Sequence, residues 1–520
     1  MEGRQDFIRL LRKRMGGRYL IALVAGLIAG NLTHLYMIAN KITNLDDISG
    51  IPGVGGGAAL GRWLQPRLHH LFSVWSAPAI NGEMSILFLS LAACLMILLL
   101  EIRTEGGAAL AAILLVTFPS VTSNMYYMLL APTFALAVLM SVLGVYLTRH
   151  YRFGWIFGVI LQILSMACYQ AYFAVAASLY VLLLILMLTD GKKVTEAFWL
   201  GVKFLMTLAL SMAGYLISVR IVGEELADYK GLSSIGSFSP VSLLHAFLRC
   251  YHRLMQYFIT APESYMAGAP ALFNRLSVIA AVILIPVIFC QRKLYTERSR
   301  AVIWGILLAA LLPFAMSVFY LMAPELDRAS TVMTFSYVIF DLMILALCER
   351  LRLPGEGKAR PALRALLIAT FLILCCKAYS VYRVANIAYY RSYIAQERTV
   401  NYLNRIYARL EEQGDYRYGD RVAILGGFYP DPIIIGRYQM GGEKLIDLEG
   451  ATLEDHLFLP ANRLQLERVF LGIDSEEVTE EERDAIMKKD AFARMPAYPE
   501  DGCIQRIDGI WVVKIAEDDR

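Results

Sequence analysis

Two adjacent aspartates, Asp46 and Asp47, follow the first long apolar segment of the chain, in the stretch ITNLDDISG. A carboxylate within hydrogen-bond distance of a hydroxyl group can take its proton while that oxygen attacks a sugar carbon. The same residue type also caps the first turn of a helix, where it accepts a hydrogen bond from a backbone N–H group. The spacing alone leaves both roles open.

Cations that could bind a phosphate stand in two other segments. Arg62 precedes Trp63 in the sequence GRW, where the pair either contacts a phosphate or anchors the chain at a membrane surface. Arg328 ends the sequence PELDR, a short segment between two apolar stretches, in which charges are costly unless they are paired or used. Glu325 and Asp327 would hold Arg328 for a ligand or form a surface ion pair with it.

A third group of candidates lies in the sequence YQAY, which contains Tyr169, Gln170 and Tyr172. Tyrosines at the ends of apolar segments usually belong to the aromatic belt of a membrane protein. Their rings also pack well against the face of a sugar. These residues are therefore candidates for binding a substrate as well as for anchoring.

The composition indicates what kind of protein must position these side chains. Of the 520 residues, 57% are hydrophobic and only 18% are charged, whereas soluble domains contain about 25% charged residues. Eleven apolar segments approach the roughly 20 residues that a helix needs to cross a bilayer. We predict a mainly α-helical, polytopic membrane bundle. The predicted spans are 19–40, 84–101, 107–123, 130–148, 154–169, 171–189, 197–219, 277–290, 301–321, 330–348 and 362–380.

The distribution of Lys and Arg predicts the orientation of the bundle. With the N-terminus inside, the cytoplasmic segments carry 20 of these residues, and the external loops that precede the C-terminal tail carry nine. Lys and Arg are retained on the cytoplasmic side, so this orientation is favoured. An odd number of spans then places the C-terminus outside, together with Asp46, Asp47, Arg62 and Arg328.

The chain divides into two predicted parts. Residues 1–380 form the transmembrane region, with large external loops at 41–83 and 220–276. Residues 381–520 have a soluble composition and form an external α/β domain. Each large loop contains an amphipathic stretch that is able to lie along the membrane surface as a helix.

Three patterns predict the secondary structure of the C-terminal part. A long helical pattern covers residues 383–412, and RVAILGGF (421–428) is typical of a buried strand. The sequence CIQRIDGIWVVKI (503–515) predicts a β-hairpin around Asp508-Gly509, a dipeptide favoured in two-residue turns.

Together these motifs resemble a family of bacterial glucosyltransferases that decorate O-antigen and related surface polysaccharides and have the GT-C membrane fold. The tail MPAYPEDGCIQRIDGIWVVKI (495–515) is also similar to the ends of its members. The resemblance implies a polyprenyl-phosphate-linked sugar donor, usually of glucose, used in an inverting transfer on the outer face of the cell membrane. It implies that Asp46 or Asp47 is the catalytic base and that Arg328 binds the donor phosphate.

The partners expected from the resemblance are the lipid-linked donor, a surface polysaccharide or other glycan acceptor, and the bilayer, with no nucleic acid. Metal dependence varies across the GT-C fold, because arginine is able to neutralise a phosphate leaving group in place of a metal. His245 and His252 have no third ligand nearby in the sequence. We therefore assign no cofactor and no metal ligand, although the fold leaves room for a divalent metal.

Transport of a polyprenyl-linked glycan is the alternative function. A transporter or flippase requires polar residues deep inside several spans and often contains inverted repeats with broken helices. The predicted spans contain few such residues, among them Asn31, Gln162 and Asp341, and show no repeat. Asp341 either takes part in function or stabilises the bundle through a hydrogen bond.

Overall fold

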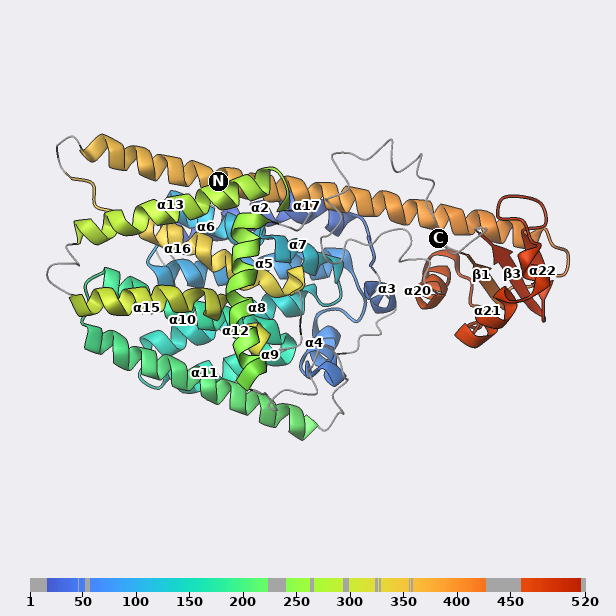
Figure 1. Ribbon diagram of the computed structural model, residues 1–520, viewed down its shortest axis with the longest axis horizontal. Coiled ribbons are helices and arrows are strands. Elements are labelled where there is room, and N and C mark those ends of the chain that lie inside the picture. Colours follow the sequence, from blue (N-terminus) through green and yellow to red (C-terminus); the bar gives the residue numbers. More distant parts are fainter. Residues whose placement is uncertain are drawn as a thin grey trace, which may run out of the picture.

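The computed structural model shows a bundle of long helices with a small α/β part at one end (Figure 1). Most of the chain is helical, and a three-stranded sheet lies near the C-terminus. The prediction of a mainly α-helical membrane bundle is therefore confirmed. The structure describes residues 16–44, 46–51, 57–222, 240–261, 266–292, 299–322, 326, 329–354, 356, 359–426 and 460–515.

Each predicted span corresponds to an apolar helical segment. Within the described residues, eight helices are long and apolar enough to cross a membrane, one further segment is a bent pair, and two shorter apolar helices fill the remaining positions. The long helices are α2 (Gly17–Ala39), α5 (Pro78–Leu100), α8 (Ala131–His150), α10 (Phe173–Thr189, preceded by the 3-10 turn η2, Gln170–Tyr172), α11 (Val194–Val222), α13 (Ala269–Gln291), α16 (Val338–Cys348, preceded by η7, Thr331–Tyr337) and α17 (Ala359–Glu411). The shorter helices are α9 (Gly154–Cys168) and α15 (Ser299–Met316).

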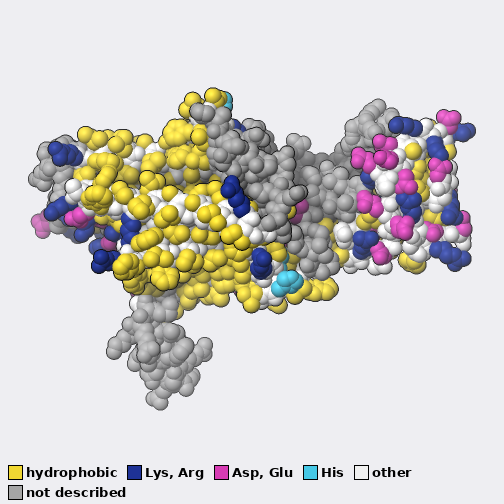
Figure 2. Space-filling model, turned by 90° about the horizontal axis from the view of Figure 1, so that it is seen from below, with side chains coloured by type: hydrophobic (Ala, Val, Ile, Leu, Met, Phe, Trp, Pro, Cys, Tyr) yellow, Lys and Arg dark blue, Asp and Glu magenta, His cyan; other side chains and the backbone are white. Residues whose placement is uncertain are grey.

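The helices differ in how much of their surface the protein itself covers. Helix α10 lies in the centre of the bundle, since almost all of its residues are buried. Helix α11 lies at the periphery, where large apolar side chains such as Leu205 and Ile221 are exposed. Figure 2 shows hydrophobic side chains covering the bundle, with Lys and Arg side chains at the end farthest from the C-terminal part. Such a surface requires a lipid environment, so the chain is a multi-pass membrane protein.

The third span is broken inside the bundle. Helix α6 (Glu105–Val116) and helix α7 (Pro119–Tyr126) meet at an angle of 41°. The break occurs at Pro119, which favours the first turn of a new helix and lacks the N–H group needed to continue the old one. All eight residues of α7 are buried, although Ser120, Thr122, Ser123 and Asn124 are polar.

The two amphipathic stretches, 58–75 in the first large loop and 239–258 in the second, form different structures. Helix α12 (Pro240–Met255) continues into the π-helix η4 (Gln256–Thr260) and runs across the direction of the spans, as predicted for a surface helix (Figure 1). The stretch in the first large loop does not form one helix. It contains the 3-10 turn η1 (Ala58–Leu60) and the short helix α4 (Gln65–Phe72), because Gly61 between them adopts a positive φ of 74°.

Helix α17 has 53 residues and continues from the bundle into the C-terminal part. The boundary that we placed at residue 381 lies inside this helix, and the division into two domains stays a prediction. Strand β1 (Val422–Leu425) pairs parallel to β3 (Ile510–Lys514), which pairs antiparallel to β2 (Ile504–Ile507). The predicted hairpin is confirmed, with positive φ at both turn residues, Asp508 and Gly509.

The C-terminal part also contacts the segment that carries the aspartate pair. Ile48 belongs to the short helix α3 (Asp47–Gly50) and packs in one apolar cluster with Leu403 of α17 and Leu466 of α20 (Pro460–Leu466). All three side chains are fully buried or nearly so. Helix α3 is thus held between the bundle and the C-terminal part. The rest of that part contains the helices α21 (Glu480–Met487) and α22 (Asp490–Ala493).

Candidate active site

The two adjacent aspartates occupy different environments. The Asp47 side chain is only 1% exposed and forms an ion pair with the ammonium group of Lys41. Its carboxylate also accepts hydrogen bonds from the Ser76 hydroxyl group, at 2.9 and 3.1 Å, and from the backbone N–H of Leu129, at 3.1 Å. Asp46, by contrast, is exposed. Asp47 is therefore held inside the protein, while Asp46 lies at its surface.

Neither aspartate caps helix α3 through its side chain. Asp46 occupies the N-cap position, but its carboxylate makes no capping hydrogen bond. The Asn44 side chain takes that role, because its Oδ1 atom accepts a hydrogen bond of 2.6 Å from the backbone N–H of Asp47. The capping role that the sequence left open is thus not observed, and the carboxylate of Asp46 is not used to cap the helix.

Helix α17 positions the loop that leads to the aspartates. The Gln396 side chain donates a hydrogen bond of 2.8 Å to the carbonyl group of Lys41 and accepts one of 2.8 Å from the backbone N–H of Thr43. One turn earlier, the Ser392 hydroxyl group lies 2.9 Å from the Tyr126 hydroxyl group at the end of α7. A helix more than 300 residues away in the sequence therefore determines where Lys41 and Asp47 lie.

The predicted groups at GRW and YQAY come together. The Arg62 guanidinium group lies over the Tyr169 ring, 4.6 Å from its centroid, and its Nε atom donates a hydrogen bond of 3.2 Å to Gln170 Oε1. The Gln170 amide donates to the Leu60 carbonyl group at 2.6 Å and to the Tyr215 hydroxyl group at 2.9 Å. A cation, two aromatic rings and an amide thus meet at the ends of α9, α10 and α11. We call these four residues, Arg62, Tyr169, Gln170 and Tyr215, the Arg62 group.

The other two residues predicted in these motifs contact the protein. Tyr172 is fully buried, and its hydroxyl group accepts a hydrogen bond of 2.7 Å from the Asn124 amide of α7. The indole N–H of Trp63 donates a hydrogen bond of 3.0 Å to the Ser218 hydroxyl group of α11. These contacts fix the two motifs to the bundle, and direct contact of either residue with a sugar stays a prediction.

Helix α7 and the turn after it join the aspartates to the Arg62 group. Asn124 contacts Tyr172 on one side, and the backbone N–H of Leu129, five residues later, contacts Asp47 on the other. The Asn124 Oδ1 atom is buried and accepts no hydrogen bond within the described chain. One short buried segment therefore sets the relative positions of the two candidate groups.

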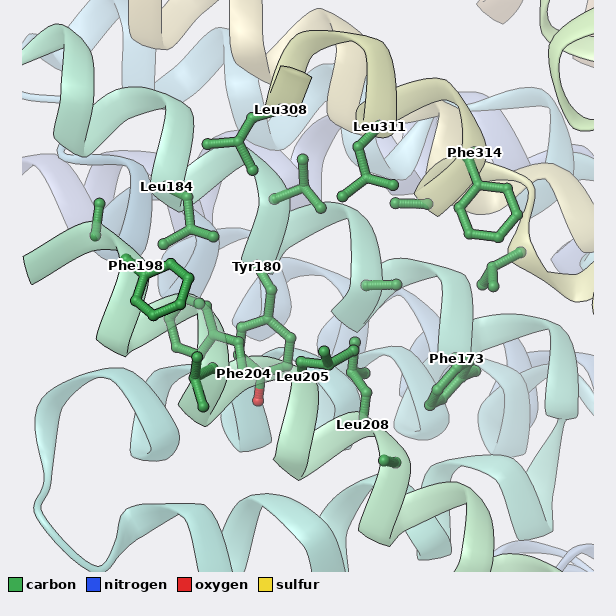
Figure 3. Close-up of a pocket in the computed structure, with 18 of the residues that line it drawn as sticks. Phe173, Tyr180, Leu184, Phe198, Phe204, Leu205, Leu208, Leu308, Leu311 and Phe314 are labelled. Carbon is green, nitrogen blue, oxygen red and sulfur yellow. The ribbon is translucent and has the colours of Figure 1, made fainter. Parts of the chain in front are cut away.

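A long apolar groove begins at the residues that directly follow Tyr172 and Tyr215 in the sequence. It has a volume of about 630 Å³ and is lined by side chains of α10, α11 and α15 (Figure 3). Phe173, which directly follows Tyr172, and Leu216, which directly follows Tyr215, line one end of the groove, and Leu188 and Val194 line the other. Large lining side chains such as Leu205 and Leu311 are exposed on the apolar surface of the bundle, so the groove opens toward lipid.

Comparison with known families assigns this arrangement to a class of enzyme. The family model described as glucosyl transferase GtrII matches residues 35–347, more than half of the chain. The chain belongs to the GtrII glucosyltransferase family. No curated protein and no solved structure matches the chain. The resemblance to bacterial surface-polysaccharide glucosyltransferases, and the prediction that the protein is a glycosyltransferase, are both confirmed.

The family match covers all of the predicted site residues of this glucosyltransferase, from Asp46 to Arg328. Glu325, Asp327 and Arg328 lie outside the described residues. Their neighbours are held by α12 and the turn η6 (Val318–Leu321). Arg249 donates a hydrogen bond of 2.9 Å to the Leu326 carbonyl group, and the Tyr320 hydroxyl group accepts one of 3.0 Å from the backbone N–H of Ala329.

The possible metal ligands in the described part of the glucosyltransferase do not form a metal site. No three His, Cys, Asp or Glu side chains in that part come close enough together to hold an ion. His252 instead lies 2.8 Å from the Gln256 amide. We assign no step of the reaction to a metal.

His69 is a buried titratable group close to Arg62 in the sequence. Burial, together with the charge of His70, lowers the pKa of His69 to about 4. The side chain is therefore neutral at physiological pH, and its Nε2 atom has no hydrogen-bond partner within the described chain.

Sequence reasoning missed several residues that form this site. Lys41, Ser76 and Gln396 are single polar residues in separate segments, and no motif marks them. Lys41 offered the clearest signal, since it is a cation six residues before Asp47 at the same end of the first span. Asp341, which the sequence left open between a functional and a structural role, forms a buried ion pair of 2.7 Å with Lys377.

Proposed function

We propose that this glucosyltransferase transfers glucose from a polyprenyl-phosphate donor to a cell-surface glycan, at the extracytoplasmic face of the cell membrane and with inversion. The groove between α10, α11 and α15 is the observation that carries the proposal. It is apolar and opens toward lipid, and one of its ends is lined by Leu216, which directly follows Tyr215, a partner of Gln170. Gln170 also accepts a hydrogen bond from Arg62. A donor with a long isoprenoid tail and a phosphate group fits these properties, whereas a water-soluble nucleotide sugar would leave the groove unexplained.

Asp46 acts as the general base. Its exposed carboxylate takes the proton of an acceptor hydroxyl group while that oxygen forms a bond to the anomeric carbon of glucose. The bond from this carbon to the phosphate oxygen breaks on the opposite side, which inverts the configuration, and polyprenyl phosphate leaves. Asp46 then returns its proton to solvent. Asp47 positions Asp46, because its own carboxylate is already bound by Lys41, Ser76 and Leu129.

Arginine neutralises the negative charge that remains on the phosphate. Arg62 is a partly exposed residue whose guanidinium group is held by Tyr169 and Gln170. Arg328 is the second candidate for this role, with Glu325 and Asp327 as its supports. Charge-assisted hydrogen bonds from a fixed guanidinium group favour a leaving phosphate without a metal.

The proposed orientation places the N-terminus in the cytoplasm and the C-terminal part outside. The excess of Lys and Arg in the predicted cytoplasmic segments supports it. Helices α3 and α4 lie at the end of the bundle nearest the C-terminal part, so the aspartate pair is then external (Figure 1).

Blocking the groove tests the use of a lipid-linked donor. Ala209 lines the groove on α11, and its neighbour Leu210 is exposed to lipid without lining it. In Ala209→Trp we expect the rate of glucose transfer from a long-chain polyprenyl donor to fall at least about tenfold, because the indole ring occupies the space of the tail. Transfer from a donor with a short prenyl chain should change little.

Leu210→Trp is the matched control, since it adds the same ring at the same depth of the same helix. It should transfer glucose from both donors at the rate of the unmodified enzyme. Equal rates of long-chain transfer in the two variants would overturn the assignment of the groove. Transfer from a nucleotide sugar without any lipid-linked donor would overturn the proposed substrate class.

A further inference from the structure

A second cavity lies at the end of the bundle opposite Asp47, and the proposed reaction does not use it. Its volume is about 350 Å³. Four arginines line it, from four different segments: Arg18, Arg103, Arg149 and Arg350. Among the described residues, the carboxylates that line the same cavity are Glu101 and Asp190, so the described lining carries a net positive charge.

The pairing of these residues shows which cations remain for a ligand. Arg350 is committed to the protein, because it is bound to both oxygens of Asp190 at 3.0–3.1 Å and to the Leu100 carbonyl group at 3.0 Å. Arg103 pairs with Glu101 at 3.1 Å. Arg149 forms no hydrogen bond or ion pair with any described residue. Arg18 donates one hydrogen bond, of 2.7 Å, to the Tyr19 hydroxyl group, and keeps further N–H groups for a ligand.

A neighbouring arginine confirms that the region carries an excess of positive charge. Arg292 follows α13 and lies 3.8 Å from Asp190, the carboxylate that Arg350 also uses. Its Nε atom is buried and has no hydrogen-bond partner among the described residues. Burial and the adjacent Arg352 guanidinium group lower the pKa of Arg292. An anion bound here would relieve this repulsion.

The walls of the cavity indicate the kind of anion. Leu98, Leu99, Leu183, Leu186 and Met187 line it together with the arginines. A free phosphate ion would gain nothing from these apolar side chains, whereas a lipid presents a phosphate and a hydrocarbon chain side by side.

The cavity is separate from the groove of the proposed donor. Helix α10 contributes Leu183, Leu186, Met187 and Asp190 to the cavity, at spacings of three and four residues that place them on one face of the helix. The groove uses another face of α10, which carries Val181, Leu184 and Leu188. The tail of a donor in the groove therefore does not extend into the cavity.

We propose that this cavity binds the phosphate headgroup of an acidic glycerophospholipid from the adjacent leaflet, with Arg149 and Arg18 as its principal ligands. The apolar walls contact the first part of the acyl chains. The lipid completes the packing of α2, α5, α8 and α10 at this end of the bundle, since residues of all four helices line the cavity.

Lipid binding to the full-length protein in detergent tests the proposal. Native mass spectrometry would count phosphatidylglycerol and phosphatidylcholine molecules retained from an equal mixture, and thermal unfolding would be measured with each lipid and with inorganic phosphate. We expect preferential retention of phosphatidylglycerol and a higher Tm with it. In Arg149→Ala/Arg18→Ala the affinity for phosphatidylglycerol should fall by about tenfold or more, because charge-assisted hydrogen bonds to the phosphate are lost.

Arg152→Ala is the control, because Arg152 is an exposed arginine at the same end of the bundle and does not line the cavity. It should retain phosphatidylglycerol like the unmodified protein. Equal retention in the double variant and this control would overturn the site. An equal rise in Tm with inorganic phosphate alone would overturn the assignment to a lipid, as would preferential retention of polyprenyl phosphate over phosphatidylglycerol. None of these outcomes depends on glucose transfer, so the inference stands or falls separately from the proposed function.

Discussion

Asp46 and Asp47 show how two identical neighbouring residues take different roles. The Asp47 carboxylate accepts hydrogen bonds from a side-chain cation, a hydroxyl group and a backbone N–H, and it is buried. The Asp46 carboxylate is exposed and does not cap the helix that follows. The difference in burial therefore separates a positioning residue from a candidate base in a way that sequence spacing could not.

Substituting each aspartate by asparagine should give two distinct results. We expect Asp46→Asn to lower kcat by about 10²–10⁴-fold with little change in Tm, because it removes a base whose side chain is exposed. Asp47→Asn should lower the free energy of unfolding by about 1–3 kcal/mol, because Lys41 loses its partner. Transfer assays and thermal unfolding in detergent would measure both. Full activity of Asp46→Asn would contradict its role as the base.

The sequence placed Arg62, Tyr169 and Gln170 at the ends of apolar segments on one side of the membrane, but it did not predict the contacts between them. The hydrogen-bond partners of Asp47 could not be predicted from the sequence. Ser76 and the Leu129 N–H group contact Asp47 only because of how the helices pack. Almost any residue type can supply a backbone N–H group, so no sequence pattern marks this donor. Those contacts depend on tertiary structure rather than on local pattern.

At the scale of single elements, we expect the docking of helix α4 to depend on pH. It packs against α8 and contains His69, which is buried and neutral. Its pKa is about 4 in the folded protein and close to the ordinary value of 6.5 when α4 is undocked or unfolded. Between these values the unfolded state binds more protons than the folded state, so stability falls as pH decreases from 6.5 toward 4.

Replacing His69 should remove part of this pH dependence. We expect the fall in Tm between pH 7.5 and pH 5 to be smaller in His69→Gln than in the unmodified protein, because glutamine does not titrate. Thermal unfolding at the two pH values would measure the difference. His70→Gln is the control, since His70 is exposed on the same helix and should leave most of the fall in place. Identical behaviour of all three proteins would contradict the role of His69.

Periodicity and length were sufficient to predict the spans and the C-terminal hairpin. The amphipathic stretch of the first loop was not predicted correctly, because a single residue, Gly61, divides it into two short pieces. The division of the third span into α6 and α7 was also missed. Pro119 and the polar residues that follow it were the available signal, but we predicted one continuous span over 107–123.

At the scale of the whole molecule, the C-terminal part supports the helix that follows the candidate base. Leu466 of α20 packs against Ile48 of α3 and Leu403 of α17. Residue patterns predicted a soluble C-terminal part, but they could not predict this contact, because Ile48 and Leu466 are ordinary apolar residues far apart in the sequence. The family match ends at residue 347, so α17 and α20 lie beyond the matched region.

Removing the Leu466 side chain should therefore reduce catalysis as well as stability. Leu466→Ala leaves a cavity that costs about 2–5 kcal/mol of local stability, and we expect kcat to fall because α3 loses its support. Met495→Ala is the matched control, since Met495 is equally buried but belongs to a separate apolar cluster of the C-terminal part. It should reduce the stability of that part while kcat is retained. A similar loss of kcat in both variants would show that α3 is not the cause.

Helix α17 also contacts the loop of the aspartate pair at two points along its length. Gln396 holds Lys41 and Thr43, and Leu403, seven residues later, packs against Ile48. Seven residues correspond to about two helical turns, or roughly 10.5 Å, so both contacts lie on one side of α17 and the loop runs alongside it. The position of the aspartate pair is therefore determined by contacts with helix α17 and not by the lipid surface. A thicker or thinner bilayer would tilt the surrounding helices, yet the distance between the loop and α17 would not change.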